Sequence, residues 1–435
     1  MKSDWRSGGL WLWLLLLPMF FQIFHYKQEV GPIYYLAKVW PALLAPLVLY
    51  TVLTCRLPDG PLYMLLVAYT IFLTPILSLV YLPNGLLDAA LSTVKAWPLT
   101  FYFSVAGALI LLRPSENTLV RATIVCGVAT FLAMVLLWVV VPAEAFQPTP
   151  FGANMFSWDE GRGNFIRMPM MLAEVALFWL GQRLVREWRA WQFLLLACAL
   201  LAMITIYKAR LPTGVSIIIL TCVLLARLPG RWRWGLGAVT MAPALAAVMI
   251  VGPQVPELLA RAFDESLFIR LRSIGIAWDW LSGDPVKLLL GSGSISSFSS
   301  ITMAEFLGKA DFYLADIGWL GIVMEYGLIG TALIAIVHLR ALTGAWVTSK
   351  DDPFRCAIMN YVLFEIMCSA VYSSMYAPGP VVTVAAIAFW LKVRDAAGMT
   401  RHQPGWPIAG GAVQINSPDW ARGRVPVPVN RTGSI

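Results

Sequence analysis

Long apolar runs separated by short polar segments dominate the sequence. Such runs are close to the roughly 20 residues that a helix needs to cross a bilayer, and a helix satisfies the backbone hydrogen bonds within the run itself. No alternation with period two, as a membrane β-barrel requires, is present. The predicted spans are residues 10–24, 36–54, 62–80, 97–112, 119–141, 168–182, 191–207, 213–227, 235–252, 313–338, 356–373 and 378–392. The pattern therefore predicts an all-α polytopic membrane protein with about twelve transmembrane helices.

Composition agrees with this class. Hydrophobic residues make up 59% of the chain and charged residues 13%, about half the charged share of an average soluble domain. The first run follows Lys2 and Arg6, but no small-x-small cleavage site comes after it. We therefore expect an uncleaved first helix rather than a signal peptide.

The basic residues predict the orientation of the chain. With the N-terminus in the cytoplasm, 20 of the 32 Lys and Arg residues fall in inside segments and 12 outside. Five of those 12 lie in one long outside loop, and long loops carry little weight in the positive-inside rule. A bacterial inner-membrane protein with both termini cytoplasmic is predicted. The net charge of +8 does not indicate nucleic-acid binding, because the basic residues are scattered between apolar runs.

Three segments depart from the pattern of apolar runs joined by short loops: two long outside loops and a C-terminal tail. One is a polar outside loop at residues 141–167, and another is the outside loop of about 60 residues at 253–312. Within the second loop, residues 274–278 are expected in an amphipathic surface helix and residues 291–293 in a tight turn. Residues 1–392 are predicted to form the transmembrane domain, and residues 393–435 a disordered cytoplasmic tail.

Arginines and lysines gather at three places on the predicted outer face. They are Arg162 with Arg167, Lys208 with Arg210, and Arg270 with Arg272. Each pair could anchor a helix end by snorkelling. Three such clusters on one face are also what an anionic ligand requires, because guanidinium grips phosphate bidentately. Polyprenyl-diphosphate-linked sugars are anionic substrates of this membrane face.

Other candidate groups have structural alternatives. Trp278 suits stacking on a sugar ring, although Trp is also enriched at membrane interfaces. Asp311 and Asp316 lie where the long loop re-enters the membrane, and could transfer protons or cap a helix start. No histidine or cysteine pattern typical of a metal site occurs, so no metal or other cofactor is expected.

Four segments together resemble the O-antigen polymerase and ligase superfamily, over residues 155–335. They are, in chain order, Gly161-Arg162-Gly163-Asn164 with Met168-Pro169; Lys208-Ala209-Arg210-Leu211-Pro212-Thr213-Gly214; Arg270-x-Arg272, Trp278, Asp284-Pro285 and Gly291-Ser292-Gly293; and Asp311-Phe312-Tyr313-Leu314 with Glu325-Tyr326-Gly327. The family's Ser before the turn arginine is replaced by Ala209.

The resemblance implies a metal-independent membrane glycosyltransferase of the GT-C type, acting on undecaprenyl-diphosphate-linked glycans without a nucleotide sugar. Its catalytic candidates are Arg210, Arg270, Arg272 and Asp311; its substrate-binding candidates are Arg162, Arg167, Lys208, Trp278 and Tyr313. A chain-length regulator and other polysaccharide assembly proteins are candidate partners, besides the bilayer. The apolar, Trp-rich character is similar to xanthan-type exopolysaccharide polymerases.

Two alternatives stay open. Ligases of the superfamily carry a His-Asn pair near the re-entry helix, where this chain has Ala310-Asp311, so a polymerase is favoured. A transporter or flippase would place ionisable residues mid-span or break its helices near the midplane. The main carboxylates within spans are Glu174 and Glu365.

Overall fold

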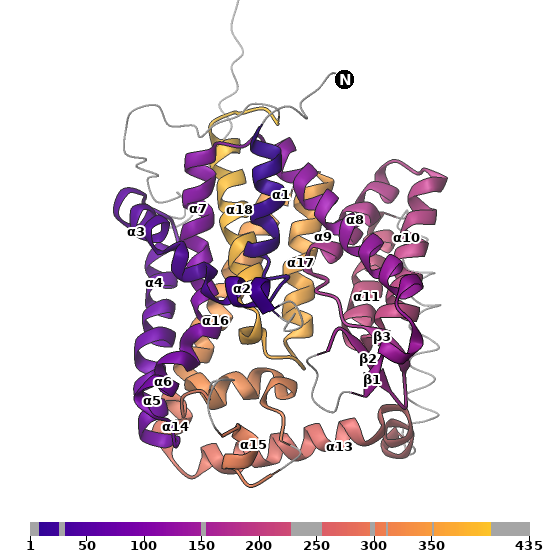
Figure 1. Ribbon diagram of the computed structural model, residues 1–435. Coiled ribbons are helices and arrows are strands. Elements are labelled where there is room, and N and C mark those ends of the chain that lie inside the picture. Colours follow the sequence, from indigo (N-terminus) through magenta and orange to yellow (C-terminus); the bar gives the residue numbers. More distant parts are fainter. Residues whose placement is uncertain are drawn as a thin grey trace, which may run out of the picture.

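The computed structural model describes residues 8–25, 31–148, 154–227, 255–295, 301–309, 312–349 and 352–401, with the side chains of residues 255–267 excepted. The described chain is predominantly helical (Figure 1). Seven helices pack around one apolar core in the middle of the molecule. They are α1 (Gly8–Phe20), α7 (Phe101–Leu112), α8 (Glu116–Val140), α9 (Met171–Arg186), α16 (Gly318–Ser349), α17 (Pro353–Cys368) and α18 (Gly379–Ala396).

The remaining long helices flank this core. On one side lie α2 (Gly31–Leu43), α3 (Ala45–Thr54), α4 (Gly60–Ala68), α5 (Thr74–Tyr81) and α6 (Leu86–Ser92); on the other lie α10 (Ala190–Ala202) and α11 (Arg210–Arg227). Many side chains of these flanking segments are exposed and apolar, such as Leu53 of α3 and Phe72 between α4 and α5. Leu132 of α8, a helix of the core group, is exposed as well. Exposed apolar surface of this extent is typical of a protein that is covered by lipid.

Five described helical segments are long and apolar enough to cross a membrane, or six if one bent pair counts as a span. The five are Gly31–Thr54, Gly60–Tyr81, Glu116–Val140, Ala190–Tyr207 and Leu314–Ser349. Each overlaps a predicted span, and most boundaries shift by a few residues. The predicted span 235–252 lies outside the described residues, and the count of twelve stays a prediction.

Several spans are broken, which periodicity did not predict. The bent pair, Leu86–Lys95 and Trp97–Leu112, meets at an angle of 50°. In α16 the break is at Gly327, whose φ of +63° is outside the helical region. A Cβ at Gly327 would lie 2.3 Å from the carbonyl oxygen of Leu289, so only glycine fits there.

A small sheet forms in the first outside loop, where only an irregular polar loop was predicted. Strand β2 (Phe156–Asp159) pairs antiparallel with β3 (Gly163–Ile166), and the short β1 (Gln147–Pro148) pairs parallel with β2. Strands of two to four residues are too short to leave a clear alternation in sequence. Phe165 and Ile166 are nevertheless both buried, and since consecutive residues of a strand point to opposite faces, both faces of β3 are packed here.

The second outside loop forms a layer across the lower end of the bundle (Figure 1). It contains α13 (Val255–Ser282), α14 (Pro285–Leu290) and α15 (Met303–Phe306), so the predicted helix at 274–278 is confirmed. The predicted tight turn at 291–293 is wrong: these residues form no turn, although Gly291 and Gly293 have φ of +89° and +83°, and residues 291–294 are buried. It lies against the break in α16, where Ser292 N–H donates to the Met324 carbonyl at 2.9 Å.

The opposite end of the bundle is joined by a buried ion network. Arg355, at the start of α17, donates to Glu116 at 2.9 and 3.0 Å and to Asp395 at 2.7 and 2.9 Å. Arg401 contacts Glu116 at 3.4 Å and Asp352 at 2.8 Å. Helix α18 thus continues past the predicted boundary at residue 392, and residues 393–401 are packed on the bundle. Residues 402–435 of the predicted tail lie outside the described residues.

Candidate functional site

The hairpin of β2 and β3 holds two of the predicted arginines around one aromatic ring: Arg162 lies in its turn and Arg167 directly follows β3. Arg162 pairs with Asp159, its Nε donating to the carboxylate at 2.8 Å. The guanidinium carbons of Arg162 and Arg167 lie 4.4 and 5.4 Å from the centroid of the buried Phe165 ring. The hairpin therefore fixes two guanidinium groups through one salt bridge and two cation–π contacts.

Lys208 connects the turn before α11 to this hairpin. Its Nζ donates to the Arg162 carbonyl at 2.7 Å and lies 5.8 Å from the Trp138 ring centroid. Lys208 has a φ of +51°, a conformation that costs a non-glycine residue roughly 1 kcal/mol or more. The contacts that Lys208 makes with Arg162 and Trp138 therefore offset the cost of its strained backbone conformation.

Arg270 of α13 approaches the same region from the lower layer. Its guanidinium lies 5.8 Å from the ring centroid of Tyr372. Tyr372 is in the segment between α17 and α18. Asp316, just before α16, interacts electrostatically with both Arg270 and Arg167. The tertiary structure thus brings arginines from two distant loops to a single carboxylate.

The two arginines of the long loop differ in position. Arg270 shares a face of α13 with the buried Ala277 and Leu281, because seven residues make about two helical turns. Arg272 lies roughly 200° further round the helix and is exposed. Arg270 is therefore on the packed face of α13, near Asp316. Arg162, Arg167, Arg270 and Asp316 are hereafter the arginine cluster.

The other predicted site residues are placed as follows. Arg210 is the exposed first residue of α11, two residues after Lys208. Trp278 is 52% exposed on α13. Tyr313 is half-buried, and its N–H contacts Ser273 Oγ of α13 at 3.4 Å. Asp311 lies outside the described residues.

The guanidinium groups of Arg162 and Arg167 repel one another. Burial and the nearby charge of Arg162 lower the pKa of Arg167 from its ordinary value. Burial raises the pKa of Asp159, but the hydrogen bond and charge of Arg162 outweigh it and hold that pKa below its ordinary value. A bound anion would relieve the repulsion between the guanidinium groups.

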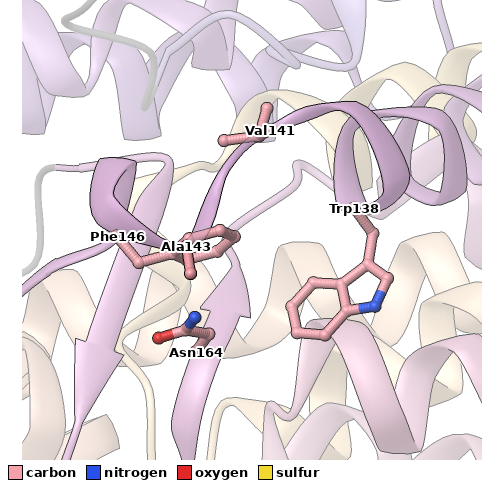
Figure 2. A pocket seen from close by; sticks show the side chains of 5 residues that line it. All are labelled: Trp138, Val141, Ala143, Phe146 and Asn164. Carbon is pink, nitrogen blue, oxygen red and sulfur yellow. The ribbon is translucent and has the colours of Figure 1, made fainter.

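A pocket of about 240 Å³ opens beside Lys208 (Figure 2). It is lined by Trp138, Val141, Ala143, Phe146 and Asn164. Trp138 and Phe146 meet edge to face at a centroid distance of 5.8 Å, and Asn164 adds an amide. An aromatic face with one amide is suited to the apolar C–H face and the hydroxyl groups of a sugar ring.

The sequence did not predict a role for Tyr372 and did not single out Asp316. Tyr372 carries no pattern that links it to an arginine 102 residues earlier, and only the fold reveals the contact. Asp316 was one of two acidic candidates at the re-entry point, and its electrostatic interactions with Arg270 and Arg167 single it out. In the described residues, no group of three or more His, Cys, Asp or Glu side chains could hold a metal ion.

Comparison with known protein families finds no matching family model, and comparison with curated proteins finds no match either.

Proposed function

We propose that this protein is a membrane glycosyltransferase that polymerises undecaprenyl-diphosphate-linked repeat units at the periplasmic face of a bacterial inner membrane. The proposal includes twelve transmembrane helices and a GT-C-like architecture. The observation that carries it is the arginine cluster, in which Arg162 and Arg167 of the hairpin and Arg270 of α13 come from two distant loops to one end of the bundle. Their fork geometry suits a diphosphate.

The proposed reaction is a displacement at the anomeric carbon of the donor glycan. An acceptor hydroxyl oxygen forms the new C–O bond, while the bond between C1 and the diphosphate oxygen breaks. The diphosphate leaves with the electron pair, and the arginines stabilise its growing charge. The hydroxyl proton passes to a carboxylate, for which Asp316 is the described candidate, and then to water.

The Trp138 pocket supports a glycan substrate rather than a simple anion. It lies beside Lys208, whose Nζ contacts both the pocket's Trp138 ring and the carbonyl of Arg162. A glycan whose diphosphate is bound by the arginines could place one of its sugar rings in this pocket.

A transporter is the second candidate, and the broken spans favour it. Lys95 and Glu325 form an ion pair between two broken helical segments, as discontinuous helices do in transporters. A flippase for lipid-linked glycans would also use a cluster of cations.

Cells that lack the protein distinguish these functions. We expect mass spectrometry of their undecaprenyl-linked glycans to show single repeat units and no long polymer, because polymerisation is blocked. Long lipid-linked polymer would indicate a ligase instead. An unchanged lipid-linked pool would contradict both enzymes and favour transport of another solute.

Orientation is tested by cysteine labelling in whole cells. Ser282 ends α13, in the layer across the lower end of the bundle (Figure 1), and Trp188 follows the end of α9, where Arg186 contacts Cys356 beside the ion network of Arg355. Both residues are exposed. A membrane-impermeant thiol reagent should label Ser282→Cys, with the unsubstituted chain as background, and should label Trp188→Cys only after the cells are opened. The reverse result would place the arginine cluster on the cytoplasmic side and contradict a periplasmic reaction.

A further inference from the structure

A second group of cationic side chains lies where two broken spans meet. Lys95 is at the bend of 50° between Leu86–Lys95 and Trp97–Leu112. Its ammonium pairs with the carboxylate of Glu325, two residues before the break of α16 at Gly327. Charged groups at breaks in apolar helices are costly and mark functional sites more often than lipid-facing anchors.

Glu325 is held in place by the loop at 291–294. Ser294 Oγ donates to Glu325 Oε1 at 2.9 Å, and the Ser294 N–H donates to Ser78 Oγ at 2.7 Å. A Cβ at Gly293 would lie 2.4 Å from the backbone nitrogen of Ser78, so the loop fits tightly. The Glu325 side chain is 3% exposed and that of Lys95 17%, which leaves the ammonium as the accessible partner.

Lys38 of α2 adds a second ammonium. Its Nζ lies 2.9 Å from His25 Nε2 and 5.2 Å from the Tyr34 ring centroid, and Lys38 repels Lys95 electrostatically. An ammonium can only donate, so His25 accepts this hydrogen bond as a neutral ring. Helix α2 packs against the segment Thr93–Lys95, so the ammonium groups of Lys38 and Lys95 lie in one region, together with the Glu325 carboxylate that pairs with Lys95. The excess positive charge is partly buried, and an anion would relieve its cost.

One short segment connects this group to the arginine cluster. Between α17 and α18, Tyr372 lies against Arg270 and Tyr376 lies 5.6 Å from the Lys95 ammonium. Residues four apart are separated by at most about 14 Å of extended chain. The Cα atoms of the two tyrosines lie within that distance, and this one segment contacts both cationic groups.

We propose that Lys38 and Lys95 bind the diphosphate of a second lipid-linked glycan, the acceptor. The proposal rests on polymerisation as the function, because that reaction joins two diphosphate-linked substrates, whereas a ligase or flippase takes one. Arginines at the donor site and lysines at the acceptor site suit the different roles of the two diphosphates. Arginine forks suit the donor diphosphate whose charge grows as it leaves, and lysine point charges suit a diphosphate that is only held.

The test is the number of undecaprenyl diphosphate molecules bound by the purified full-length protein in native mass spectrometry. The unsubstituted protein is expected to bind two. Lys38→Gln and Arg270→Gln should each bind one, and the double variant none. Lys392→Gln, which removes an exposed lysine of α18, is the matched control and should bind two.

Loss of Lys95 alone could unfold the protein, because it leaves Glu325 buried without its counter-ion. The double variant Lys95→Gln/Glu325→Gln removes both charges and should bind one molecule. Glu325→Gln alone keeps both ammonium groups and should still bind two.

The outcomes separate the two proposals. If the unsubstituted protein binds one molecule, which Arg270→Gln removes and Lys38→Gln does not, the acceptor site is wrong while the arginine site stands. If Lys38→Gln lowers the number and Arg270→Gln does not, the arginine site is wrong. No binding to the unsubstituted protein would contradict both.

Discussion

Arg270→Gln is expected to reduce polymer synthesis by about 100-fold or more, the loss typical of removing one group that stabilises developing charge. The neighbouring substitution Arg272→Gln removes the same charge from the opposite face of α13 and should change the rate by less than about threefold. The difference follows from position, because Arg270 lies against Tyr372 and interacts with Asp316, whereas Arg272 is exposed on the opposite face of α13.

The measurement is the rate of polymer formation from purified lipid-linked repeat units by equal amounts of each variant. The rate of the Arg270→Lys variant is expected to fall between those of the unsubstituted protein and of Arg270→Gln, since lysine keeps the charge and loses the bidentate fork. Equal effects of Arg270→Gln and Arg272→Gln would mean that net charge on this face matters rather than a positioned guanidinium. Unaltered thermal unfolding of each variant excludes a folding defect.

Arg355→Met is expected to destabilise the protein by about 3–5 kcal/mol, the cost typical of breaking a buried ion pair. Arg355 has a side-chain exposure of 9% and joins Glu116 of α8 to Asp395 of α18. Methionine is apolar and leaves Glu116, which is 5% exposed, without the guanidinium that donates to both its oxygens, while Arg401 still contacts it at 3.4 Å. Three helices lose their common contact at the upper end of the bundle.

The control is Arg340→Met, because Arg340 is 47% exposed and pairs with Asp59 at 3.7 Å. An exposed pair of this kind contributes about 0–1 kcal/mol, so its unfolding temperature should hardly move. Thermal unfolding in detergent and the amount of protein in the membrane are the readouts. Activity per folded molecule should stay unchanged in Arg355→Met, since the network lies at the opposite end from the arginine cluster (Figure 1). Equal unfolding temperatures for both variants would contradict the structural importance of the network.

The sequence by itself determined where most helices lie and which loops carry the cations. Both are properties of contiguous residues: an apolar run of about 20 residues has one stable solution in a bilayer. The hairpin arginines Arg162 and Arg167 are also neighbours along the chain, so their association with one another follows from their spacing. The helical nature of residues 274–278 was accessible for the same reason.

Only the tertiary structure decided which distant groups meet. Arg270 and Arg272 are equivalent in the sequence, and the packing of Ala277 and Leu281 of α13 with Ile317 and Met324 at the start of α16 separates them. Lys38, Lys95 and Glu325 come from three different spans, and no local pattern relates them. His25, far from the family-like segments in sequence, lies against Lys38 in the fold. Periodicity reports burial along one element, whereas a site of opposed charges depends on how several elements pack, which no single segment encodes.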